Sequence, residues 1–337
     1  MSKKILAFET SCDDTSVAII DTEYNVLINL ISSQIEHENY GGVVPELASR
    51  LHIKNIMHIT KLALDKTKID LKEIDALAVS VNPGLIGSLL VGVSFAKGLA
   101  YSIQKPLIAV NHMLGHIYAN KITHPQLKPP YLALIVSGGH TQLIYFKAQN
   151  HYKVVGETLD DAAGEAFDKV AQLLDLGYPG GPIIDKYAKN GNSDFAEFPR
   201  AMNKKYNYNF SFSGFKTAVR TYLEKHSKKF INKHRADICA SVQTAIVDSL
   251  VTKTLNYAKK NQINDIIIAG GVSANSELRK RMTEQAHILE IKVNFPELQY
   301  CMDNAAMIGA AAIPKFFQHD FADLKLNAFS KKGLRFI

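Results

Sequence analysis

Cysteines are scarce in this sequence, and they do not form a pattern typical of paired or metal-binding cysteines. Cys12, Cys239 and Cys301 are odd in number, widely spaced and without a Cys-x-x-Cys pair. A disulfide framework is therefore not expected, and a reducing compartment is indicated. We expect a soluble protein of the cytoplasm.

Long apolar runs are also lacking. The run Ile5–Phe8 is too short for the apolar part of a signal sequence and is ended by Glu9. The longest uncharged stretch, residues 76–96, is cut by Asn82-Pro83-Gly84. We interpret it as a buried strand, a tight turn and a buried helix, because a membrane span would need about 20 uninterrupted apolar residues. No membrane association is expected.

The two halves of the 337-residue chain show the same order of elements, which indicates a duplicated α/β lobe. In each half, two apolar strands flank a short polar turn, and a later apolar strand ends in a glycine turn followed by a helix. The paired strands are 5–8 with 16–20 and 131–136 with 141–146, and the later strands are 74–81 and 263–269. Two such lobes would face each other across a cleft lined by the ends of their strands.

The predicted boundaries follow from this repeat. The first lobe takes residues 1–123 together with about 303–337, including a closing helix over 303–317. The second lobe takes 124–302 and carries a helical insertion at about 156–235, since the second half is longer than the first. The proline-rich segment 122–130 is the predicted crossing between the lobes.

A histidine pair follows the apolar run 107–110. His112 and His116 are four residues apart, so on a helix both imidazoles would lie on one face and could reach one ion. Two solvated histidines, or one core histidine and one helix cap, are the alternatives. Zinc peptidases of the His-Glu-x-x-His type need a glutamate after the first histidine, and Met113 stands there. Asp303 is the best candidate for a third ligand, with a helix N-cap as its alternative role.

Two kinds of turn could face a nucleotide. The first strand pair flanks a turn with three carboxylates, Glu9, Asp13 and Asp14, although an ordinary polar hairpin would look the same. Glycine turns at 137–139 and 270–275 expose backbone amides, which suits phosphate. The acidic segment 160–169 places Asp168 where it could bind ribose or ligand amides, or lie on a solvated helix face.

Basic residues give the chain a net charge of +7, a weak indication of a polyanionic partner that lysine-rich codon usage would explain equally well. Several of them alternate with aromatic residues, as in proteins that bind nucleic acid, although a solvated face is the simpler interpretation. They are Lys204, Lys205, Tyr206, Tyr208, Lys225, His226, Lys228, Lys229, Lys233, His234, Arg235, Lys331, Lys332 and Arg335.

Taken together, the motifs resemble those of the bacterial tRNA N6-adenosine threonylcarbamoyltransferases (TsaD), within the actin-like, sugar-kinase and Hsp70 fold group (ASKHA). The resemblance runs in order along nearly the whole chain. It rests on Glu9-Thr10-Ser11-Cys12-Asp13, Gly42–Arg50, Lys97-Gly98 with His112 and Gly115-His116-Ile117, Ser137–Thr141, Phe212-Ser213-Gly214 with Lys216-Thr217, and Gly270–Asn275.

The resemblance implies an α/β fold of two actin-like lobes around a central nucleotide-binding cleft. It implies one iron or zinc ion held by His112, His116 and Asp303, and transfer of a threonylcarbamoyl group from threonylcarbamoyl-AMP to N6 of adenosine 37 in tRNAs that read codons beginning with A. Asp13 is the first candidate for the catalytic base, with Asp14 and Glu9 as rivals. The implied substrate-binding residues are Ile135, Val136, Ser137, Gly138, Gly139, Asp168, Gly181, Asp185 and Asn275.

The resemblance also implies partners: an inactive paralogue (TsaB-like), an ATPase (TsaE-like) and a separate enzyme that makes the adenylate. Three other functions stay open on the residues alone. A kinase or chaperone-like ATPase of the same fold would hold Mg²⁺ with carboxylates rather than imidazoles. A metallopeptidase is disfavoured by Met113, and a non-catalytic tRNA-binding subunit would need none of the metal ligands.

Overall fold

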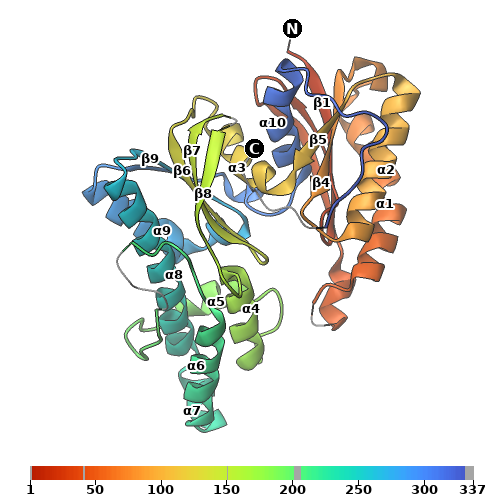
Figure 1. Cartoon of the computed structure of the whole chain (residues 1–337). Helices are drawn as coiled ribbons and strands as arrows, with labels where there is room; N and C mark the ends of the chain where they lie inside the picture. The colour runs from red at the N-terminus through yellow and green to blue at the C-terminus, as the bar shows by residue number, and fades with distance from the viewer. Residues whose placement is uncertain (1, 41, 150, 201–205, 331–337) are drawn as a thin grey trace. The chain divides into compact units, whose positions relative to one another are not determined.

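The computed structural model divides the chain into two compact units. Among the described residues, unit 1 comprises those from 2–127 and 296–330, and unit 2 those from 128–295. The structure describes residues 2–40, 42–149, 151–200 and 206–330. Each unit has its own sheet with helices beside it (Figure 1). Each sheet has five strands, and each unit has its own apolar core.

The sheet of unit 1 has the strand order β3-β2-β1-β4-β5. The first three strands form an antiparallel meander, and β4 and β5 run parallel to β1. The predicted hairpin is therefore confirmed, with Glu9 opposite Ser16 at its turn. The strands are β1 (Lys4–Glu9), β2 (Asp14–Asp21), β3 (Val26–Ser33), β4 (Ala76–Asn82) and β5 (Leu107–Asn111).

Alternate residues of β1 face opposite sides of this sheet, as a strand requires. Ile5 and Ala7 belong to the core that packs on α3 (His112–Thr123) and α10 (Ala305–Phe317). Leu6 and Phe8 belong to the core on the other face, under α1 (Pro45–Thr67) and α2 (Ile86–Ile103). Both sides of β1 are fully buried, so the turn at its end is held by a rigid strand.

Helix α2 is the one helix of the described residues that is long and apolar enough to cross a membrane by length and composition. One such helix is weak evidence, because core helices pass the same test. In unit 1 this helix packs on α1 and β4. The predicted strand, turn and helix over residues 76–96 are confirmed, since β4 ends at Asn82 and α2 begins at Ile86.

The sheet of unit 2 has the order β10-β9-β6-β7-β8 and repeats the topology of unit 1. Strands β6, β7 and β8 form an antiparallel meander, while β9 and β10 run parallel to β6. The predicted α/β class and its internal repeat are confirmed. The strands are β6 (Tyr131–Val136), β7 (Thr141–Ala148), β8 (His151–Glu157), β9 (Asp265–Ala269) and β10 (Lys292–Asn294).

The helices of unit 2 share one apolar core with its sheet. The long helix α8 contributes buried residues along most of its length. The helices are α4 (Ala163–Leu173), α5 (Gly180–Ala188), α6 (Ser213–Glu224), α7 (Lys228–Lys233), α8 (Arg235–Lys260) and α9 (Ser276–Ile288). Short 3₁₀ segments complete the described elements: η1 (Ile35–Tyr40), η2 (Leu71–Glu73), η3 (Gly271–Ala274) and η4 (Leu298–Tyr300).

Candidate active site

The histidine pair lies at the beginning of α3. Asn111, the last residue of β5, caps this helix: its side-chain oxygen accepts hydrogen bonds from the amides of Met113 and Leu114. The cap fixes His112 as the first helical residue, directly at the end of a strand. His116 follows one turn later, and the two ring centroids are 4.7 Å apart. Both rings are buried.

Helix α10 brings Asp303 to the histidines. The N-cap of α10 is Asn304, whose side chain accepts from the Met307 amide, so the alternative role of Asp303 as the cap is wrong. The next amide, that of Ala305, donates to Ser16 on β2 at 2.8 Å. Because these bonds fix the start of the helix, the residue before it has a defined position.

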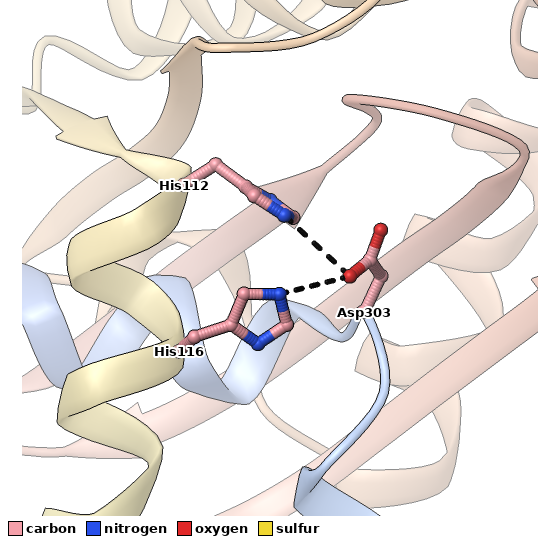
Figure 2. A group of neighbouring side chains, drawn as sticks. All are labelled: His112, His116 and Asp303. Carbon is pink, nitrogen blue, oxygen red and sulfur yellow. Dashed lines mark ion pairs between the residues drawn. The ribbon is translucent and has the colours of Figure 1, made fainter. Parts of the chain in front are cut away.

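Three ligand atoms converge at this point of unit 1 (Figure 2). Asp303 Oδ1 lies 3.5 Å from His112 Nε2 and 3.2 Å from His116 Nε2, and all three atoms lie within 4.8 Å of one another. Ligands about 2.1 Å from a tetrahedral zinc would be separated by roughly 3.4 Å. The spacing therefore fits a single metal ion.

The surroundings of the two histidine rings also favour a metal site. Neither ring nitrogen of His116 makes a hydrogen bond within the part of the chain that the structure describes. Burial would lower the pKa of His112, but the carboxylates of Asp303 and Glu9 outweigh it and raise that pKa to about 9. Buried nitrogen lone pairs and carboxylates that favour positive charge suit a bound cation.

The three predicted catalytic carboxylates lie at the turn between β1 and β2 and differ in exposure. Glu9 is completely buried, whereas Asp13 and Asp14 are partly exposed. Burial and the nearby Asp303 raise the pKa of Asp14 to about 6, against the lowering effect of a hydrogen bond from Ser33. The turn therefore joins one buried carboxylate to two that solvent or substrate can reach.

His52, which the sequence analysis missed, holds this turn in place. Its ring is completely buried on α1, with Nε2 2.9 Å from the carbonyl oxygen of Cys12 and Nδ1 2.8 Å from Thr15 Oγ1. Since a carbonyl only accepts, Nε2 carries the proton and Nδ1 accepts from the Thr15 hydroxyl. A signal was present: His52 stands in the apolar stripe of α1 between Ala48 and Ile56.

In unit 2, the turn after β6 contains two glycines with open space around them. No described atom lies within 4 Å of a Cβ built at Gly138 or Gly139, and neither has a left-handed φ. Packing and backbone strain therefore do not demand glycine there, whereas close approach of a ligand to the backbone would. Ile135 and Val136 before them are fully buried, so neither side chain is exposed to a ligand.

The remaining predicted substrate-binding residues form one connected group in unit 2. The Gly164 amide on α4 donates to the Ser137 carbonyl at 3.2 Å. Further along α4, Asp168 accepts from the Gly180 amide at 2.7 Å, at the N-terminus of α5. Burial raises the pKa of Asp168 above its ordinary value, although the amides of Gly180 and Gly181 oppose this increase. The structure thus joins the Ser137 turn to the N-terminus of α5.

From α5 the group continues to α9. Asp185 accepts from the amide and hydroxyl of Ser276, at 3.2 and 2.7 Å. Asn275 caps α9 through the Leu278 amide, and its Nδ2 donates to Gln243 at 2.8 Å. The side chains of Asp168, Asp185 and Asn275 are therefore engaged within unit 2, and Gly181 has open space where a Cβ would stand.

Part of the basic set also lies in unit 2. Lys225, Lys228, Lys229 and Lys233 are exposed around α7. The neighbouring aromatic and histidine rings contact one another in a continuous series. In order, these rings are Tyr222, His226, Phe230, His234 and Phe195. Lys204, Lys205, Lys331, Lys332 and Arg335 lie outside the described residues.

Comparison with known proteins identifies the family. A sequence profile of the tRNA N6-adenosine threonylcarbamoyltransferases matches residues 25–310. A protein of that name from Thermosipho africanus is 50% identical over 325 residues, which cover 96% of this chain and 98% of the relative. This chain belongs to the tRNA N6-adenosine threonylcarbamoyltransferase family. A relative from Clostridium perfringens is 49% identical and is covered to 99% in both chains.

Solved structures of low sequence identity support the fold of this family member. HypF from T. kodakarensis, 12% identical, covers 95% of this chain with a TM-score of 0.62, and the match covers 48% of HypF. Component A of (R)-2-hydroxyglutaryl-CoA dehydratase from Acidaminococcus fermentans, also 12% identical, covers 93% of this chain and 98% of its own with a TM-score of 0.55. The actin-like fold class is confirmed.

Proposed function

We propose that this chain transfers the threonylcarbamoyl group from threonylcarbamoyl-AMP to N6 of adenosine 37 in tRNAs that read codons beginning with A, with release of AMP. The observation that carries the proposal is the convergence of His112, His116 and Asp303 within a chain of this family. A kinase of the same fold would have no use for two buried imidazoles aimed at one carboxylate oxygen.

The proposed cofactor is one divalent ion, Fe²⁺ or Zn²⁺. Two imidazoles and one carboxylate suit both metals, since the set occurs in zinc enzymes and in non-haem iron enzymes with open positions. Bound there, the ion would act as a Lewis acid toward the donor oxygens and would neutralise charge on the phosphate. A metallopeptidase is disfavoured because Met113 stands where that class needs its glutamate.

The reaction forms a bond between N6 and the carbamoyl carbon and breaks the bond from that carbon to the phosphate oxygen. The amine must lose a proton, and its lone pair is delocalised into the adenine ring, so orientation matters. Asp13, partly exposed on the turn after β1, is the proposed proton acceptor or amine-orienting group. Asp14 is its rival, because a pKa of about 6 is close to that of an efficient base at neutral pH.

Unit 2 is proposed to bind the adenylate. The open glycines 138 and 139 would let its phosphate or ribose approach backbone amides closely. Gly181 would do the same at the N-terminus of α5. We propose that Asp168, Asp185 and Asn275 hold these segments in place through their hydrogen bonds within unit 2. Their remaining hydrogen-bonding capacity would serve to contact the nucleoside.

The proposed macromolecular partners are tRNA, an inactive paralogue and an ATPase, and the proposed location is the cytoplasm. The paralogue would dock on the apolar side chains that α1 and α2 expose, including Ile53, Met57, Ile86 and Tyr101. Because α1 and α2 pack on each other, these side chains would contribute to one protein interface. The exposed lysines around α7 are proposed to contact the tRNA backbone.

The test is a transfer assay. The metal-loaded chain is incubated with threonylcarbamoyl-AMP and unmodified tRNA, alone and with each partner, and modified adenosine is measured after nuclease digestion. The proposal predicts product at position 37 in at least one combination. Absence of product in all of them, with tRNA binding intact, would favour a binding subunit, and ATP turnover without product would favour an ATPase.

A further inference from the structure

Glu9 is a buried carboxylate whose two oxygens are both turned inward. It ends β1 and is completely buried. One oxygen, Oε1, accepts from the Ser11 amide at 2.5 Å, and the other, Oε2, lies 3.2 Å from His112 Nδ1. A proton acceptor for substrate would have to present an oxygen to it. Glu9 presents its oxygens to its own turn and to a proposed metal ligand.

The other partner of His112 Nδ1 is the hydroxyl of Ser11, at 3.0 Å. Two tautomers are therefore conceivable for a neutral His112 ring. If Ser11 donated to a bare Nδ1, the proton would be on Nε2, and the nitrogen lone pair at Nδ1 would face the Glu9 carboxylate. If Nδ1 carries the proton, it donates to Glu9, and the Nε2 lone pair points toward Asp303 and His116.

We propose that Glu9 is a positioning residue of the metal centre. Its carboxylate holds His112 in the Nδ1–H tautomer, fixes the rotation of the ring and leaves the lone pair of Nε2 for the ion. A negative partner on the far nitrogen also makes the imidazole a better ligand, the usual effect of a carboxylate behind a metal-bound histidine. The inference rests on the metal-binding role that the proposed function gives to His112.

The two ligand histidines differ in this respect, which makes the inference specific. His112 has Glu9 and Ser11 behind it, whereas His116 makes no hydrogen bond at either ring nitrogen within the described residues. The position of His116 depends on packing, since its ring is 1% exposed. Glu9 therefore acts on one of the two histidines only.

The test uses metal binding by the full chain. Zn²⁺ affinity and the visible absorption of bound Co²⁺ are measured for the wild type, Glu9→Gln and Glu9→Ala at one fixed pH. Loss of the carboxylate is expected to weaken Zn²⁺ binding about 10–100-fold and to shift the Co²⁺ bands. Glu9→Gln, which keeps an acceptor without the charge, should lose less than Glu9→Ala. Wild-type affinity and spectrum in both variants would overturn the proposal.

Asp21→Asn is the matched control. Asp21 is also a buried carboxylate of unit 1, 7% exposed, but it accepts from Glu23 and Asn25 in the turn after β2. Its replacement should leave metal affinity unchanged. A Glu9 variant that binds metal normally but fails to transfer would assign Glu9 to the chemistry instead and would also overturn the proposal.

A measurement on the wild type covers the case in which Glu9 variants do not fold. With ¹⁵N-labelled histidine and Zn²⁺ bound, long-range proton–nitrogen correlation identifies which nitrogen of His112 carries the proton. The proposal predicts Nδ1–H with Nε2 on zinc, and a proton on Nε2 would contradict it. Lack of transfer by the wild type would contradict the proposed function but not the role of Glu9, since neither metal affinity nor the tautomer depends on the substrate.

Discussion

A Cβ at Gly115 would come within 2.9 Å of Ile308 Cδ1 and 3.2 Å of Met307 Cγ. The glycine between the two ligand histidines therefore lets α3 approach α10 closely. Asp303 immediately precedes the cap of α10, so the distance between these helices sets the distance between the third ligand and the first two. The absence of a side chain at Gly115 therefore couples the packing of α3 on α10 to the geometry of the metal site.

Gly115→Ala should reduce metal affinity more than stability. Overpacking costs about 1–3 kcal/mol, but alanine in place of glycine within a helix returns about 1 kcal/mol. We expect the free energy of unfolding to change by less than about 2 kcal/mol while Zn²⁺ binding weakens at least tenfold. Denaturant unfolding and zinc titration measure the two effects. Gly98→Ala on α2, where a Cβ meets open space, should leave zinc affinity unchanged.

Gly139→Ala should weaken nucleotide binding without destabilising unit 2. No described atom crowds a Cβ there, so the added methyl group would take up the space proposed for the adenylate. AMP affinity by calorimetry should fall at least tenfold, with a melting temperature near that of the wild type. Gly164→Ala is the contrast: its Cβ would lie 2.5 Å from the Ser137 carbonyl oxygen, so it should lower the melting temperature. Unchanged AMP affinity in Gly139→Ala would count against the proposed site.

His52 should make unit 1 sensitive to acid. Burial lowers its pKa below the ordinary 6.5, so the unfolded chain takes up the proton first as the pH falls. The stability held by the neutral ring is complete above pH 6.5 and is lost as the pH drops toward the folded pKa, by at most about 1.4 kcal/mol per pH unit. Denaturant unfolding from pH 7.5 to 5 should show a steeper loss in the wild type than in His52→Gln. His58→Gln, at an exposed position of the same helix, should retain the wild-type slope.

The sequence predicted the elements with strong local signals. Both hairpins, the strand, turn and helix over 76–96 and the closing helix over 303–317 follow from apolar runs bounded by glycine, proline or polar turns. It did not predict β3 and β8, because these outer strands of their sheets are partly exposed and lack a continuous apolar run.

At the site, the four-residue spacing predicted that His112 and His116 share a helix face, and the structure brings Asp303, the candidate third ligand, within 3.5 Å of both rings. That Asn304 rather than Asp303 caps α10 depends on backbone angles that a neighbouring Asp-Asn pair does not reveal. The hydrogen bonds of Glu9 and of His52 join segments that are 103 and 40 residues apart in the chain. The apolar stripe of α1 indicates that His52 is buried, but not which groups it contacts.

Charge reversal around α7 should weaken tRNA binding in a salt-dependent way. Replacing Lys228, Lys229 and Lys233 by glutamate removes three exposed cations. If these contact phosphates, tRNA affinity should fall and the slope of log affinity against log salt should decrease by up to about 3. Filter binding at several salt concentrations gives both values. A control with Lys54→Glu and Lys61→Glu on α1 should keep the wild-type slope, and an unchanged slope in the α7 variant would assign those lysines to a solvated face.

The most direct test of the account measures metal content and transfer in the same samples of wild type and Asp303→Asn. The exchange keeps the size of the side chain and removes the charge that lies 3.2 Å from His116 Nε2. The account predicts about one ion per wild-type chain with formation of modified adenosine at position 37. It predicts that Asp303→Asn folds, binds metal at least tenfold more weakly and loses transfer in proportion. Modified tRNA formed at the wild-type rate by a metal-free Asp303→Asn chain would contradict it.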